Sequence, residues 1–282
     1  MNENKLYISD LDGTLLADNA LLSDHSLTTL TDMICDGLNF TIASARSTMS
    51  MKQVVRNLPL NLPVIEINGA MISDINTGEH FIIHSLKKSI VHQLHEIITS
   101  HGCCPFIASY DGDNDKFHYE KLINEGMEWF LNDASENHTR KLNQTSDITS
   151  VFDEMVVCLA VIGNRQQVHN ICEEIELKFP EKLENHFFAN PYTPQWQWLT
   201  IHQQNANKNI AVKKLAEILE YRLDNVVVFG DNLNDVDMMK LNQLGAHTVA
   251  MDNATDEVKK YASEIIGGNG EDAVVNYIAN SS

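Results

Sequence analysis

The sequence has few cysteines and no long hydrophobic run, and both absences restrict the kind of protein it can be. Five cysteines occur in 282 residues, two of them adjacent at Cys103 and Cys104, and none forms a Cys-x-x-Cys pair. This pattern indicates neither a disulfide framework nor a zinc site, so we expect reduced and mostly buried thiols. The longest strongly apolar run, residues 155–162, is much shorter than a membrane span and predicts a buried strand.

Basic residues are also scarce. The chain has 20 lysines and arginines against 39 acids, which gives a formal net charge of −19. Nucleic acids and anionic membranes both require a basic surface, so neither is expected as a partner, and no protein partner is implied. An acid at Asp10 interrupts the N-terminal region before any apolar run reaches the length of a signal peptide. We therefore expect a cytoplasmic protein.

A chain of this length lies near the size at which one hydrophobic core stops growing, so two domains are expected. The strongest local signal is the short apolar run Leu6–Ile8, which ends at two acids, Asp10 and Asp12. Ligands of open α/β sheets bind outside the carboxyl ends of the strands, where these acids would lie. Two carboxylates this close require a proton or a cation between them, and an oxygen-rich site for one small divalent ion suggests Mg²⁺.

The segment Asp10-Leu11-Asp12-Gly13-Thr14 resembles the first motif of the haloacid dehalogenase superfamily, whose members are mostly Mg²⁺-dependent phosphohydrolases. The resemblance implies that Asp10 attacks phosphorus and that Asp12 acts first as general acid and then as general base. It also implies that Mg²⁺ is held by Asp10 and by the backbone carbonyl of Asp12. Taken alone, the motif is also compatible with a strand followed by an acidic turn.

Two further segments near the first motif carry candidate substrate contacts. The turn Ser44-Ala45-Arg46 follows a predicted strand at residues 38–43. Together with Ala43 it is similar to the Ala-Thr-Gly-Arg that is common in the family, with Ala45 in place of the usual glycine. A hydroxyl at a helix N-terminus is a good phosphate ligand. Taken alone, Ser44 favours a simple N-cap, but together with the first motif we predict phosphate contact, and the two roles are compatible. The resemblance places Arg46 and Asn68, of Asn68-Gly69-Ala70, on the substrate side. An Asn-Gly hairpin turn is the alternative for Asn68.

The remaining motifs lie in the C-terminal third. Lys208 opens an amphipathic helix at the place of the family's third-motif lysine, where it would balance Asp10 and hold the phosphoryl group. Gly230-Asp231-Asn232-Leu233-Asn234-Asp235 follows a very apolar strand and matches the fourth motif without departure. We predict Asp231 as a metal ligand, Asp235 as a direct or water-mediated one, and Asn234 as a partner of Lys208 or of a phosphate oxygen. The alternative is an acid-rich helix N-terminus.

Residues 81–189 have a different order of predicted elements from the segments on either side, with helices and short paired strands. We predict that they form an inserted α/β domain with its own core. Its expected helices and strands resemble the type IIB cap of Cof-type members of the superfamily. The main predicted elements are a helix at 87–101, strands at 105–110, 115–119 and 151–162, and a helix at 165–179. Such an insert, placed over the strand ends, would exclude water and select the leaving group.

We therefore predict an α/β fold with a doubly wound, Rossmann-like parallel sheet formed by residues 1–80 and 190–282, with a cap at 81–189. The predicted function is Mg²⁺-dependent hydrolysis of a small phosphorylated metabolite, such as a sugar phosphate, through an aspartyl-phosphate. A phosphosugar mutase on the same core is one alternative. A regulatory protein that binds a phosphorylated metabolite is another, but its mark would be the loss of a catalytic acid, and none is lost here.

Overall fold

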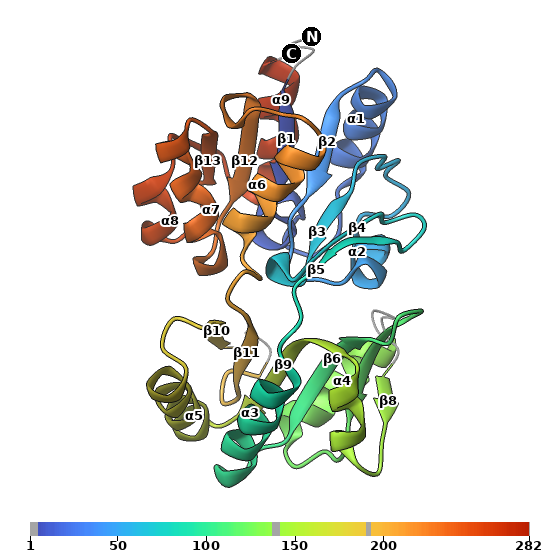
Figure 1. Cartoon of the computed structure of the whole chain (residues 1–282). Helices are drawn as coiled ribbons and strands as arrows, with labels where there is room; N and C mark the ends of the chain where they lie inside the picture. The colour runs from blue at the N-terminus through green and yellow to red at the C-terminus, as the bar shows by residue number, and fades with distance from the viewer. Residues whose placement is uncertain (1–4, 137–141, 190–192, 282) are drawn as a thin grey trace. The chain divides into compact units, whose positions relative to one another are not determined.

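The computed structural model describes residues 5–136, 142–189 and 193–281, and the chain divides into two compact units (Figure 1). One unit, the core, combines Met1–Ile82 with Asn207–Ser282, and the other, the insert, is Ile83–Ala206. Residue 190, the predicted start of the second core segment, lies outside the described residues. The prediction that the core resumes there is wrong, because β11 (Gln197–Gln203) pairs with β9 and β10 of the insert.

The core contains a five-stranded parallel sheet with β1 next to its centre. The strands follow the order β14-β13-β12-β1-β2, and every neighbouring pair is parallel. β1 is apolar throughout its first three residues because both faces of a parallel sheet are covered in such folds. The strands are β1 (Leu6–Ser9), β2 (Asn39–Ile42), β12 (Val226–Gly230), β13 (His247–Met251) and β14 (Glu264–Ile266).

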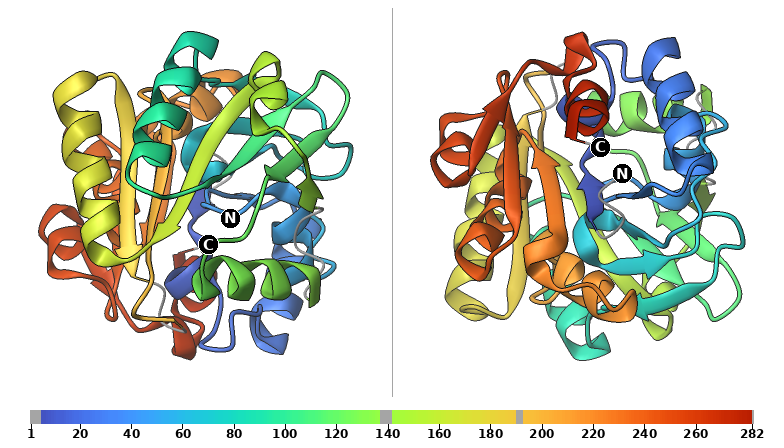
Figure 2. Two further views of the ribbon diagram at one scale, coloured as in Figure 1. Left: turned by 90° about the horizontal axis from the view of Figure 1, so that it is seen from below. Right: turned by 90° about the horizontal axis from the view of Figure 1, so that it is seen from above.

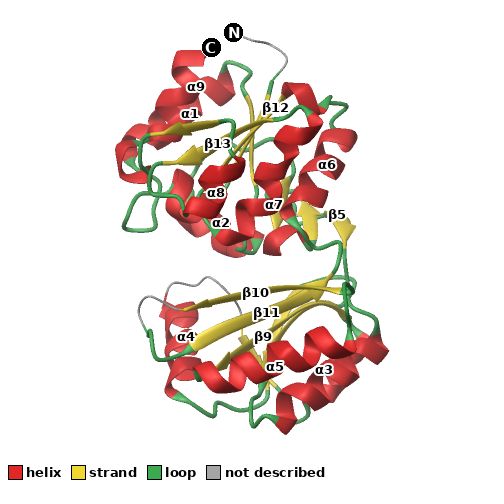
Figure 3. Ribbon diagram, turned by 90° about the vertical axis from the view of Figure 1, so that its left-hand side faces the viewer, coloured by secondary structure: helices red, strands yellow, loops and turns green. Residues whose placement is uncertain are grey.

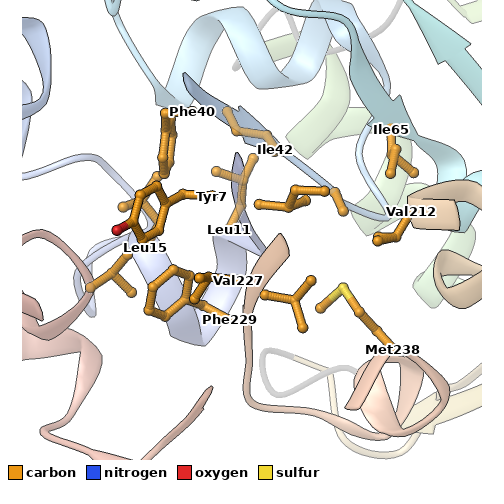
Figure 4. Packing of buried hydrophobic residues seen from close by; sticks show 14 of the residues in the cluster. Tyr7, Leu11, Leu15, Phe40, Ile42, Ile65, Val212, Val227, Phe229 and Met238 are labelled. Carbon is orange, nitrogen blue, oxygen red and sulfur yellow. The ribbon is translucent and has the colours of Figure 1, made fainter. Parts of the chain in front are cut away.

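Helices cover both faces of this sheet, as the predicted doubly wound fold requires (Figure 2). α1 and α9 lie side by side on one face, and α6 and α7 lie together on the other. Side chains from the strands and helices form one continuous apolar core that includes Tyr7, Phe40, Val212 and Phe229 (Figure 4). The helices are α1 (Asp24–Cys35), α2 (Thr48–Val54), α6 (Lys208–Ile218), α7 (Val236–Met239), α8 (Asp256–Tyr261) and α9 (Ala273–Ser281).

A small three-stranded sheet extends the core beside β2. It has the order β3-β4-β5, and a parallel bridge between Ala43 and Ile65 joins it to the end of β2. Its strands are β3 (Val64–Glu66), β4 (Met71–Ser73) and β5 (His80–Ile83). The antiparallel pair β3–β4 agrees with the hairpin interpretation of the Asn-Gly segment.

The insert is built on a six-stranded sheet of order β10-β11-β9-β6-β7-β8. Helices α3 and α5 pack together against this sheet (Figure 3), and their apolar side chains form a second core with β9 and β11. Its elements are α3 (Lys88–Ser100), β6 (Pro105–Tyr110), β7 (Asp115–Tyr119), α4 (Glu125–Glu136), β8 (Leu142–Gln144), β9 (Met155–Gly163), α5 (Arg165–Lys178), β10 (Leu183–Ala189) and β11.

The predicted fold class is confirmed. The strand predicted at 151–162 starts too early in the prediction, because the observed strand is Met155–Gly163. Residues Ile148–Asp153 form a short helical turn, and only Met155–Gly163 are extended. The side chain of Asp147 accepts a hydrogen bond from the backbone N–H of Thr149, which caps that turn and competes with strand pairing. Within the described residues, we find no helix long and apolar enough to cross a membrane.

Candidate active site

The two acid motifs meet at one edge of the core sheet. β1 and β12 are adjacent and parallel, with Ser9 opposite Phe229, so Asp10 and Asp231 follow the carboxyl ends of neighbouring strands. The hydroxyl of Thr14 donates a hydrogen bond of 2.8 Å to Asp231 Oδ1. One oxygen from each of Asp10, Asp231 and Asp235 lies within 4.8 Å of the others. The structure therefore brings together the predicted metal-ligating carboxylates.

The chain leaves Asp10 through a turn that only glycine satisfies comfortably. Asp12 has φ −71° and ψ 119°, and Gly13 has φ 77° and ψ 0°, which are the angles of a type II turn. A Cβ on Gly13 would lie 2.3 Å from Asp231 Oδ2. Gly13 thus provides both the left-handed backbone and the close approach of the two motifs.

Lys208 is the first residue of α6 and is fully buried among the acids. Its Nζ lies 2.8 Å from Asp10 Oδ1 and 2.7 Å from Asp235 Oδ1. Burial alone would lower the pKa of Lys208, but the charges of Asp10 and Asp235 raise it above its usual range. The lysine is therefore a permanent cation, and it joins the first, third and fourth motifs.

The acids carry more negative charge than Lys208 can balance. Burial, followed by the charge of Asp235, raises the pKa of Asp10 well above its usual range, against the opposing effect of Lys208. Burial and Asp235 likewise raise the pKa of Asp231 to about 7. Three carboxylates and one ammonium leave an excess of two negative charges when all are ionised. A divalent cation would neutralise this excess, and the all-oxygen donor set suits Mg²⁺.

Asp235 differs from the other acids because both of its oxygens already accept hydrogen bonds. Oδ1 binds Lys208, and Oδ2 accepts from the backbone N–H groups of Asp231 and Asn232 at 3.0 and 3.2 Å. These contacts fix the turn that follows β12. Of the two predicted roles of Asp235, direct or water-mediated binding of the metal, these contacts favour the water-mediated one.

Ser44 and Arg46 lie at the same sheet edge. The backbone N–H of Ala43 donates to Ser9 O at 2.9 Å, which places Ser44 beside the start of the first motif. Ser44 is buried, and its hydroxyl oxygen accepts from the Arg46 N–H at 3.2 Å, so the hydroxyl proton remains available to a ligand. The guanidinium of Arg46 binds both carboxylate oxygens of Asp12, at 2.7 and 2.6 Å.

Asn68 and Asn234 form a side-chain pair that the sequence does not predict. Asn234 Nδ2 donates to Asn68 Oδ1 at 3.1 Å, while Lys208 is held by the two acids and not by Asn234. Ile67, Asn68 and Gly69 all have positive φ, of 51°, 56° and 95°. A β-branched residue such as Ile67 is strained in this region. The turn is held by hydrogen bonds from Ile67 N to Arg46 O and from Asn68 N to Ser44 O.

Comparison with known proteins identifies the family. A family model described as haloacid dehalogenase-like hydrolase matches residues 7–278. The chain belongs to this family of hydrolases. The family indicated by the first motif is therefore confirmed, and the match extends over nearly the whole chain.

The curated relatives of this hydrolase include phosphatases that match it from end to end. The 5-amino-6-(5-phospho-D-ribitylamino)uracil phosphatase YitU of Bacillus subtilis (strain 168) is 27% identical over 283 residues, covering 98% of this chain and 97% of that protein. YcsE of the same organism, which carries the same activity name, is 25% identical over 276 residues, covering 97% and 94%. The hydrolase is accordingly a phosphatase.

Solved structures show the same fold. A haloacid dehalogenase-like hydrolase from Bacteroides thetaiotaomicron matches with a TM-score of 0.80 at 23% identity, over 99% of this chain and 100% of that one. A subclass IIB sugar phosphatase of the superfamily matches with a TM-score of 0.75 at 19% identity, over 99% of both chains.

Three residues of the hydrolase support the site but are absent from the predicted set. Asn253 Nδ2 donates to Gly13 O at 2.8 Å, and Thr14 binds Asp231, so both hold the first motif in place. Glu66 is buried, and its Oε2 accepts from the backbone N–H of Thr48 at the start of α2. Thr14 is visible within the first motif, and Asn253 lies in Met251-Asp252-Asn253-Ala254, whereas no sequence signal identifies Glu66.

Proposed function

We propose that the phosphatase hydrolyses a small phosphorylated metabolite by transferring the phosphoryl group first to Asp10 and then to water. The observation that supports this most strongly is the position of Lys208 between Asp10 and Asp235. Lys208 binds Asp10 Oδ1, and none of the described residues donates a hydrogen bond to Oδ2. That oxygen can attack phosphorus while the ammonium group balances the charge of the phosphoryl oxygens.

The metal would be held by Asp10, the backbone carbonyl of Asp12 and the Asp231 carboxylate, with Asp235 supporting them. When bound, Mg²⁺ would neutralise phosphoryl charge and align the group for in-line attack. Ser44, Lys208 and Asn234 are proposed to bind phosphoryl oxygens, and Asn68 and Arg46 to lie on the substrate side. Asp12, which is exposed, is proposed to protonate the leaving alcohol and then to take a proton from the attacking water.

A phosphorylated sugar or sugar alcohol is the substrate class that we infer. The support is the activity for which YitU and YcsE are named, since the substrate in that name carries a phosphate on a ribityl chain. Release of inorganic phosphate from a panel of sugar and sugar-alcohol phosphates, pyridoxal phosphate and flavin mononucleotide would test this. Stoichiometric free phosphate supports a phosphatase, whereas an isomerised phosphosugar without free phosphate would indicate a mutase.

The Asp10→Asn variant tests the mechanism, because it removes the nucleophile with little change in volume. We expect turnover of an aryl phosphate to fall by about 10³-fold or more while the far-ultraviolet circular dichroism stays unchanged. Thorough chelation of divalent ions should independently abolish turnover, and Mg²⁺ should restore it. Wild-type turnover by the variant would overturn the proposed nucleophile.

A further inference from the structure

Asp12 and Arg46 form a two-pronged ion pair at the exposed side of the site. Arg46 Nε donates to Asp12 Oδ2 at 2.7 Å and Nη2 donates to Oδ1 at 2.6 Å. The Asp12 side chain is half exposed, whereas Asp10 and Asp235 are buried. Without a partner, an exposed carboxylate on a turn would sample several rotamers. Two parallel hydrogen bonds to a planar guanidinium fix both its position and its plane.

Arg46 is itself held at three points. Its Nη1 donates to Ser50 Oγ in α2 at 3.1 Å. Its backbone N–H donates to Ser44 Oγ, and its carbonyl accepts from the N–H of Ile67. The guanidinium therefore connects the turn after β1 to the rigid segment that follows β2.

We propose that Arg46 is a positioning residue, which holds Asp12 in the orientation needed for proton transfer to the leaving alcohol. This inference rests on the proposed function, in which Asp12 is the general acid and base. Each carboxylate oxygen has two lone pairs, so Asp12 keeps room for a proton while both oxygens accept from Arg46. The proton passes from Asp12 to the leaving oxygen as the bond from phosphorus to that oxygen breaks, and Asp12 later takes a proton from the water that attacks the aspartyl-phosphate.

A direct contact between Arg46 and the substrate phosphate is the competing role. Both roles predict a loss of activity in Arg46 variants, but they differ in how the loss depends on the leaving group. A weakly basic leaving group departs without protonation, so a misplaced acid matters little. A strongly basic leaving group requires the proton, so a misplaced acid slows its release.

The experiment compares Arg46→Met and Arg46→Lys with wild type on p-nitrophenyl phosphate and on unsubstituted phenyl phosphate, in saturating Mg²⁺. We expect kcat/KM for phenyl phosphate to fall about 100-fold and for p-nitrophenyl phosphate about 10-fold or less. Lysine should not restore activity, because one ammonium cannot span both carboxylate oxygens. Adding Arg46→Met to Asp12→Asn should cause no further loss, since the two residues act together.

Arg222→Met is the matched control. Arg222 makes a similar forked pair with Asp224 on the surface, with Nη2 at 2.7 Å from Oδ2. Its replacement should leave kcat/KM unchanged for both substrates. An equal loss on both substrates with a raised KM would overturn the positioning role in favour of direct contact, and unchanged kinetics would overturn both. Turnover that persists in Asp10→Asn would instead overturn the proposed function.

Discussion

Lys208 Nζ lies 2.7 Å from Asp235 Oδ1, and neither side chain is exposed to solvent. A buried ion pair of this kind contributes little relative to an apolar pair, but removal of one partner leaves an uncompensated charge. We therefore expect Lys208→Met to lower the free energy of unfolding by about 3 kcal/mol, measured by urea unfolding without divalent ions.

The control for that variant lies on the same helix. Lys214 pairs with Glu217 at 2.7 Å, and both side chains are exposed by half or more. Lys214→Met should change the free energy of unfolding by about 0.5 kcal/mol or less. Equal effects of the two variants would contradict the electrostatic role of Lys208.

Gly13→Ala should abolish phosphatase activity, because the new Cβ would lie 2.3 Å from Asp231 Oδ2 and the φ of 77° is strained for alanine. Gly37→Ala is the control that introduces the backbone strain of a positive φ without a steric clash. Gly37 has a φ of 98°, but a Cβ there would meet nothing within 4 Å. It should lose about 1 kcal/mol of stability and keep its turnover. Active Gly13→Ala protein would show that the two motifs need not approach this closely.

Mg²⁺ should stabilise the folded protein, because Asp10 lies on a segment of the chain separate from Asp231 and Asp235, and the three carboxylates come together only after folding. At a concentration about 100 times the Kd, the gain should be about 2.7 kcal/mol, visible as a higher Tm. Asp231→Asn should lose most of this gain. Asp153→Asn, which alters an exposed acid paired with Lys88 in the insert, should keep it. A shift that survives in Asp231→Asn would place the cation elsewhere.

His202 should make the stability depend on pH. Burial, and then the neighbouring His186, lowers the pKa of His202 to about 3, against about 6.5 for an unfolded chain. Between these values the unfolded state binds more protons, so stability is lost as the pH falls below about 6.5, by up to about 1.4 kcal/mol per unit. Urea unfolding between about pH 7 and about pH 5 should show a weaker dependence in His202→Gln than in wild type. Parallel curves would contradict the buried neutral imidazole.

Much of the site follows from sequence order and sheet geometry alone. Asp10 and Asp231 each follow a short apolar run, and parallel strands end at one edge, so their convergence is predictable. The partners of Arg46 and Asn234 are not predictable in this way. Arg46 reaches Asp12, and Asn234 reaches Asn68, because of the conformations of two turns that no periodic pattern specifies.

The second boundary of the insert shows the same limit. β11 carries apolar residues such as Trp198, Leu199 and Ile201, a pattern compatible with a strand of either unit. Its antiparallel pairing with β9 and β10 assigns it to the insert. Strand pairing depends on partners far along the chain, which local composition does not identify.

The most direct test of the mechanism is detection of phosphate on Asp10. Asp12→Asn protein should accumulate the aspartyl-phosphate, because the group that activates water is lost while Asp10 and Lys208 remain. After mixing with p-nitrophenyl phosphate and Mg²⁺, acid quenching and mass spectrometry of the peptides should show one phosphate on the peptide that contains Asp10. We expect this adduct in Asp12→Asn and its absence in the Asp10→Asn, Asp12→Asn double variant. Phosphate on another residue, or turnover with no covalent adduct at any time, would contradict it.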